Sequence, residues 1–143
     1  MRSLRKFLRA RRKVKFPKII LTANVGNKPQ FCIGQSLIAE PLVGATQTFI
    51  TVGAFDTREE AEACNKYINT KFCKALLSIR KVTQHNPPDI WENVPLQDFT
   101  ANSDIDWSQS LPNIDRQLYR KYKLSWKEIA FIEANFKYRE EML

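Results

Sequence analysis

Apolar side chains recur at three- and four-residue steps over residues 61–79, and this periodicity constrains the fold more than any other feature. The apolar positions are Ala61, Cys64, Ile68, Phe72, Ala75, Leu76 and Ile79. Such spacing places the side chains on one face of an α-helix. Asp56 or Thr57 can cap the helix, and the acids that follow favour its first turn. We therefore expect one long helix from Thr57 to about Val82, buried along one side.

Three shorter segments are rich in β-branched and aromatic residues, a composition typical of strands. They are residues 14–22, 31–39 and 46–52, and the last gives the clearest strand pattern. Pro17 cannot donate a hydrogen bond to a neighbouring strand, so we expect the first strand to lie toward an edge of the sheet. The sequence thus predicts a small, mostly antiparallel or mixed sheet with the long helix packed on it.

The C-terminal residues 112–143 predict a helical hairpin. Pro112 suits the first turn of one helix. Ser125 and Glu128 have the spacing of a capping box at the start of the next. Upstream of the hairpin, prolines end any helix, and we expect an extended segment over residues 91–99 that packs its aromatic side chains.

The length of 143 residues fits a single domain, and the expected fold class is α+β. We expect a basic segment over residues 1–13 that is mobile or forms a short amphipathic helix. An α+β domain over residues 14–111 follows, and the hairpin over residues 112–143 packs on that same domain.

The net charge of +8 is concentrated near the N-terminus, because residues 1–39 hold ten Lys or Arg and no acid. A polyanion is the natural partner for this segment, although an acidic membrane surface would also attract it. No apolar run approaches the roughly 20 residues of a membrane span. Three cysteines without C-x-x-C spacing favour buried, reduced thiols over disulfides or zinc, so the cytoplasm is the expected location.

No arrangement of residues predicts catalysis by this chain alone. Residues 86–89 nearly match the Asn-Pro-Pro-aromatic motif of adenine methyltransferases, but Asp89 sets a charge where a ring must stack. A glycine-rich turn for a methyl donor is missing, and His85 is the only histidine. Asp104 and Asp106 lack calcium-loop spacing. We therefore expect no catalytic residue, no metal and no cofactor in this chain.

The basic end of the expected long helix and the residues that follow it fit nucleic-acid contact better. Candidate phosphate contacts are Lys71, Lys74, Arg80 and Lys81. Candidate base contacts, all expected in loops, are Gln84, His85, Lys28 and Gln30. This pattern predicts binding to duplex DNA, while a solvated charged face is the alternative.

Residues 94–99 (Val-Pro-Leu-Gln-Asp-Phe) resemble the V-P-x-Q-D-F segment near the C-terminus of a family of bacterial type II restriction-modification methylases. Similar segments occur in the same order, so the resemblance covers about residues 14–138. They are residues 46–50, 54–56, 67–72, 77–84, 103–108, 118–122 and 128–133. In that family this region is taken to be the target-recognition domain, whereas the methyltransferase core lies upstream.

The resemblance implies a DNA-binding target-recognition module that acts with a fused or separate methyltransferase and endonuclease. S-adenosylmethionine would then belong to that catalytic partner. The Arg-rich residues 1–13 have no counterpart in the family, and the chain could be a fragment, a split subunit or a truncated product. The alternative hypothesis is a non-catalytic protein-interaction subunit whose C-terminal hairpin docks a restriction-modification catalytic partner.

Overall fold

The structure is a computed structural model, and it describes residues 3–4, 17–22, 36–39, 49–53, 55–80 and 88–143. Within these residues the chain forms a three-stranded antiparallel sheet and four α-helices, two of them C-terminal. The α+β fold class expected from the sequence is confirmed.

Strand β1 (Lys18–Thr22) is the middle strand of the sheet, between β2 (Ser36–Ala39) and β3 (Phe49–Val52). Both pairings are antiparallel. The expectation that Pro17 pushes the first strand toward an edge is therefore wrong. Pro17 lies just before the strand, where its missing N–H breaks no ladder, and its carbonyl accepts a hydrogen bond from Phe55 N at 3.0 Å.

The stretch expected to form one long helix forms two, α1 (Arg58–Ile68) and α2 (Lys71–Arg80). Thr57 caps α1 as expected, accepting a hydrogen bond from Glu60 N. The break occurs because Thr70 acts as a second cap: its hydroxyl accepts a hydrogen bond from Cys73 N at 3.1 Å. Apolar periodicity continues across this break, which is why it predicts one helix.

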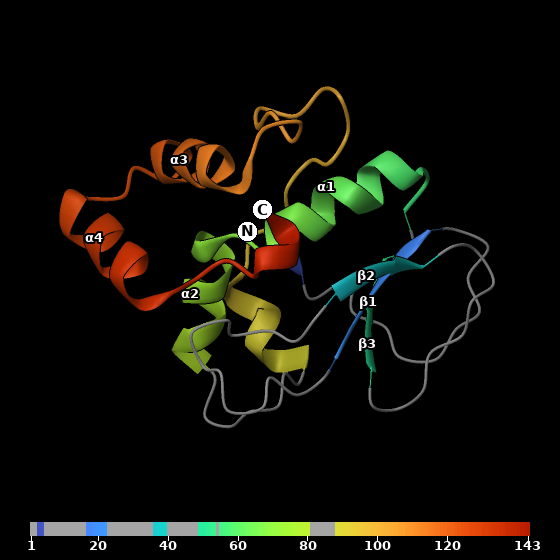
Figure 1. Cartoon of the computed structure of the whole chain (residues 1–143), viewed down its shortest axis with the longest axis horizontal. Helices are drawn as coiled ribbons and strands as arrows, with labels where there is room; N and C mark the ends of the chain where they lie inside the picture. Colours follow the sequence, from blue (N-terminus) through green and yellow to red (C-terminus); the bar gives the residue numbers. More distant parts are fainter. Residues whose placement is uncertain (1–2, 5–16, 23–35, 40–48, 54, 81–87) are drawn as a thin grey trace.

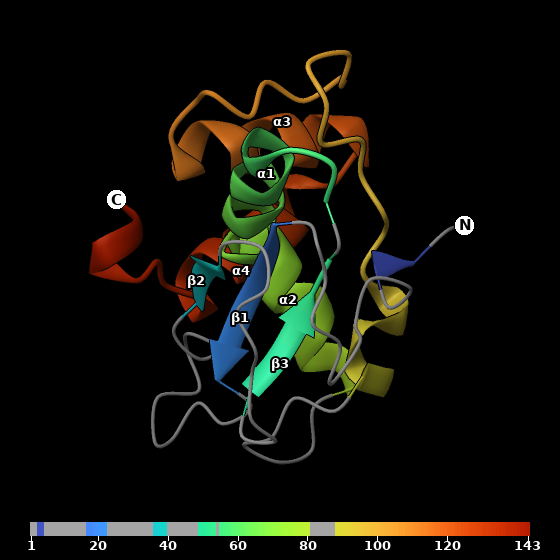
Figure 2. The ribbon, with the colours of Figure 1, turned by 90° about the vertical axis from the view of Figure 1, so that its right-hand side faces the viewer.

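The elements lie in three layers, as the two views in Figure 1 and Figure 2 show. Helix α1 lies against one face of the sheet, where it contacts β1 and β2 (Figure 1). Helix α2 in turn contacts α3 (Leu111–Lys121) and α4 (Trp126–Asn135), which lie on the side away from the sheet (Figure 1). Helix α2 also contacts α1 and therefore links the two C-terminal helices to the rest of the fold.

An aromatic cluster fills much of the core around Tyr67. Its ring centroid is 5.9 Å from that of Phe99 and 5.8 Å from that of Trp107. Trp91 is fully buried, as expected for the segment over residues 91–99. The segment is not extended throughout, because Pro88–Asn93 forms a 3₁₀ helix (η3) before the chain straightens. Cys64 and Cys73 are buried free thiols, as the sequence predicts.

Helices α3 and α4 are joined by a tight turn in which Lys123 adopts a left-handed conformation, with φ of 52°. The expected capping box is confirmed, because Glu128 N donates to Ser125 Oγ while Ser125 N donates to the Glu128 carboxylate. A last 3₁₀ helix (η4) covers Glu140–Met142. In the described part of the chain, no helix is both long and apolar enough to cross a membrane.

Candidate functional site

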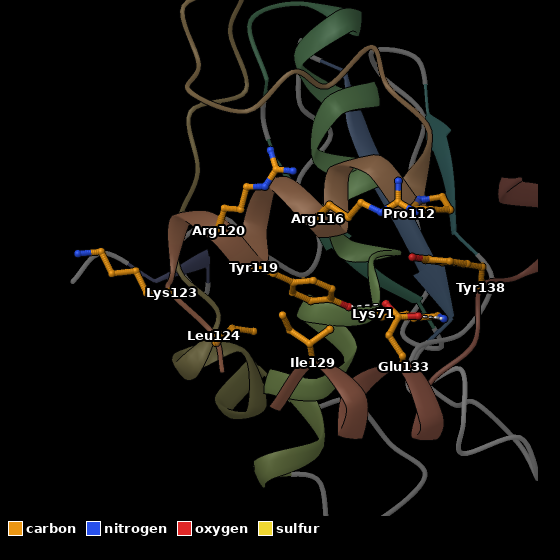
Figure 3. Close-up of a pocket in the computed structure, with 10 residues that line it drawn as sticks. All are labelled: Lys71, Pro112, Arg116, Tyr119, Arg120, Lys123, Leu124, Ile129, Glu133 and Tyr138. Carbon is orange, nitrogen blue, oxygen red and sulfur yellow. Dashed lines mark hydrogen bonds and ion pairs between the residues drawn. The ribbon is translucent and has the colours of Figure 1, made fainter. Parts of the chain in front are cut away.

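A groove of about 630 Å³ lies between α3 and α4 (Figure 3). Its walls are formed mainly by these two helices, and residues from the start of α2 and from the C-terminal segment close one end. The lining residues are Lys71, Pro112, Arg116, Tyr119, Arg120, Lys123, Leu124, Ile129, Glu133 and Tyr138. Four of them are cationic and one is acidic, so the groove carries net positive charge.

Three of the cations form a row along the α3 side of the groove. Arg116 and Arg120 are four residues apart and so lie on one face of α3, whereas Lys123 follows beyond the helix end, in the turn to α4. All three are exposed. Among the residues that the structure describes, no carboxylate forms a salt bridge with any of them. This row, which we call the α3 basic row, is available to bind an external anion.

The fourth cation is used internally, at the closed end of the groove. Lys71 Nζ lies 2.6 Å from Glu133 Oε2 and 4.7 Å from the centroid of the Tyr138 ring. Tyr119 reaches from α3 across the groove and donates to Glu133 Oε1 at 2.8 Å (Figure 3). Partial burial raises the pKa of Glu133, but hydrogen bonds from Lys71 and Tyr119 outweigh it and hold the pKa below its ordinary value.

Beneath this end, Asp115 fixes α3 against the start of α2. Its carboxylate accepts hydrogen bonds from Lys71 N at 3.0 Å and Phe72 N at 2.9 Å, and a third from the Tyr138 hydroxyl. Asp115 thus caps a helix from 44 residues away in the sequence. Burial raises the pKa of Asp115, and these hydrogen bonds only partly offset the effect.

The polar groups at the closed end of the groove are held by one another. Burial, followed by the charge of Asp115, raises the pKa of both Tyr119 and Tyr138 far above the ordinary value, so both remain neutral donors. Its one carboxylate, Glu133, is ion-paired with Lys71. Among the described residues no cluster of three His, Cys, Asp or Glu side chains could hold a metal.

The structure places only part of the site predicted from the sequence. Lys71 pairs with Glu133, and Lys74 is fully buried with its ammonium donating to Lys137 O at 2.6 Å. In this conformation both ammonium groups therefore serve internal contacts. Arg80 ends α2, although its side chain is not described. The remaining candidates lie outside the described residues: Lys81, Gln84, His85, Lys28 and Gln30.

The α3 basic row was not among the residues predicted from the sequence. Its four- and three-residue spacing is visible in the sequence, on the side of the expected helix opposite the apolar residues Ile114 and Leu118. That spacing alone does not distinguish cations that bind a ligand from those that pair internally. Lys121, for example, lies in the same helix but bonds to Asp104 and Gln97.

The V-P-x-Q-D-F segment makes internal contacts rather than lining the groove. Val94 is buried, and Pro95 O accepts the Tyr67 hydroxyl at 2.7 Å. Gln97 bonds to the side chains of Tyr122 and Lys121, at the end of α3. The carbonyl of Asp98 accepts the Trp107 indole N–H at 2.8 Å. The segment thus ties α1, α3 and the loop before α3 together.

Comparisons with protein-family models, with curated proteins and with solved structures find no match to this chain. The resemblance of its segments to restriction-modification methylases stays a prediction. Inferences about function therefore depend on the geometry of the groove and on the residue pattern.

Proposed function

We propose that this chain is a DNA-binding module in which the α3 basic row contacts the phosphates of a duplex. The observation that carries the proposal is that Arg116 and Arg120 share an exposed face of α3, that the exposed Lys123 follows in the turn, and that none of the three forms a salt bridge among the described residues. Exposed arginine and lysine that neutralise phosphates supply most of the sequence-independent affinity for DNA.

The length of the row favours a polymer over a small anion. A helix rises about 1.5 Å per residue, so Arg116 and Arg120 are about 6 Å apart along α3, and Lys123 follows beyond the helix end. Phosphates of one strand follow each other at about 3.4 Å along the duplex axis, so the row is longer than the spacing of two successive phosphates. The ten bases and no acids in residues 1–39 add positive charge for the same partner.

The proposed context is the target-recognition part of a bacterial type II restriction-modification methylase, acting in the cytoplasm. It comes from the resemblance carried by residues 94–99 and by the other similar segments. Methyl transfer and S-adenosylmethionine binding would then belong to the catalytic partner. Arg80 and Lys81 remain candidates for further phosphate contacts, and Gln84, His85, Lys28 and Gln30 remain candidates for base contacts. Lys71 and Lys74 would then hold the groove in shape through their contacts with Glu133 and Lys137.

The salt dependence of binding to a random-sequence duplex tests this assignment. Each lost phosphate contact should lower the slope of log K against log salt by about 0.9, so R120A/K123A should lower it by about two. Arg58→Ala is the matched control for Arg120→Ala, because Arg58 is an exposed arginine on α1 that pairs with Glu62. Equal slopes for the wild type and R120A/K123A would show that the groove does not contact the DNA. Absence of duplex binding at low salt would contradict the proposal itself.

A protein-interaction module remains the second candidate, and one observation favours it. Helix α4 exposes two large aromatic side chains, Trp126 by 76% and Phe131 by 62%. Large exposed aromatics mark interaction surfaces on many proteins. Chromatography with a candidate methyltransferase, at salt that suppresses DNA binding, would detect such docking. Coelution lost in F131A would support this candidate.

A further inference from the structure

Trp126 differs from the other two tryptophans of the chain in its exposure. Trp91 is fully buried and Trp107 is 9% exposed, whereas Trp126 is 76% exposed. Trp126 is the first residue of α4, and the capping box of Ser125 and Glu128 holds the backbone at this point. A large aromatic ring is thus presented to solvent from a fixed position.

The helical spacing of α4 places Trp126 beside the groove. Trp126, Ile129 and Glu133 are separated by three and four residues and so share one stripe of the helix. Ile129 and Glu133 line the groove, and Trp126 lies on the same stripe of α4, one turn nearer to the α3–α4 turn. Phe131 is five residues further on and faces a different side of the helix.

A positive charge lies at the ring. Lys127 Nζ is 5.7 Å from the centroid of the Trp126 ring, and Lys123, three residues before Trp126 in the sequence, lines the groove. An exposed aromatic among cations is the combination that holds nucleic acids, because the cations bind phosphates while the ring stacks on a base. An apolar protein partner would instead have to desolvate these lysines.

We propose that Trp126 stacks on a nucleobase that is unpaired or unstacked in the bound DNA. The inference rests on the proposed function, since the α3 basic row must first hold the phosphates. It adds a ligand class, DNA with a locally accessible base, which a phosphate contact alone would not select. The geometry required is a base turned out of the duplex toward the α3–α4 turn.

Binding of the full chain to two DNA probes tests this inference. One probe is a perfectly paired duplex, and the other is the same duplex with a single unpaired thymine. Trp126→Ala should weaken binding to the bulged probe by about tenfold, the effect typical of losing one base–aromatic stack, and Trp126→Phe should weaken it less. Phe131→Ala is the matched control, because it removes another exposed aromatic from α4, and it should change affinity less than about twofold.

Intrinsic fluorescence gives a second readout, which does not depend on measured affinities. The bulged probe should quench the emission of the exposed tryptophan in the wild type, and most of this quenching should be absent in W126F. One outcome is that W126A binds both probes like the wild type, while R120A/K123A shows a smaller slope of log K against log salt. The stacking role is then overturned and the proposed function stands. If W126A and F131A weaken binding equally, or if emission changes with protein concentration alone, the ring belongs to a protein contact. If neither probe binds at low salt, the proposed function fails and the stacking role fails with it.

Discussion

Replacing Asp115 with alanine should destabilise the protein by removing a buried acceptor that serves three donors. Phe72 N would lose a buried hydrogen bond, and Lys71 N and the Tyr138 hydroxyl would each lose a partly buried one. Unpaired buried donors cost about 1–3 kcal/mol each, so the loss is about 4 kcal/mol when partial access to water is allowed for. Relief from burying a carboxylate offsets part of this, which leaves a net loss of about 3 kcal/mol.

Urea unfolding would measure this loss through the transition midpoint. With a slope of about 2 kcal/mol per molar urea, a loss of 3 kcal/mol lowers the midpoint by about 1.5 M. Asp115→Asn keeps one oxygen acceptor and should lose about half as much. Arg116→Ala is the neighbouring control on the exposed side of α3, and its midpoint should move by less than about 0.3 M.

A midpoint for D115A within about 0.3 M of the wild type would refute the reasoning. It would mean that the start of α2 obtains its hydrogen bonds elsewhere, and that α3 is not fixed to α2 through this carboxylate. A large change in slope would mean instead that the variant alters the compactness of one state, and the midpoint alone would then not measure stability.

Two other predictions concern titratable groups in the core. Burial raises the pKa of Cys64 well above 9.0, and Cys73 is also buried. The folded variant C32S should therefore resist iodoacetamide at about pH 8, whereas both remaining thiols should react in urea. Fast labelling of the folded protein would contradict this burial. Because burial raises the pKa of Asp115 above 3.8, the folded chain binds this proton more tightly than the unfolded chain. The unfolding free energy should therefore fall as pH rises from about 3.8 through the pKa of Asp115 in the folded protein, and D115N should lack this fall. Parallel curves of unfolding free energy against pH for the two proteins would contradict the raised pKa of Asp115.

The fold class and the approximate positions of the strands could be predicted from local patterns, because strand composition and helical spacing act over a few residues. The position of β1 could not, since Pro17 restricts only its own N–H and the order of strands is set by contacts distant in sequence. The helix break was predictable in part: Asn69 and Thr70 are capping residues inside an apolar periodicity. The second half of that cap, Asp115, comes from another helix.

The candidate site was harder to predict because charge patterns do not show which cations are already paired. Lys74 and Arg120 have the same formal charge in the sequence, yet the first is buried against Lys137 O and the second is exposed in the groove. The difference arises from packing of α2 beneath α3 and α4. When other elements pack on both sides of a helix, a cation on that helix can be buried in a contact within the protein, and the spacing of residues in the sequence does not show this.

The contacts of Val94, Gln97 and Asp98 have a consequence for redesign of the groove. These residues hold α1, α3 and the loop before α3 together and leave no side chain in the groove. The exposed positions of α3 and α4 can therefore be changed without removing these contacts, and engineering of a new binding preference should begin there.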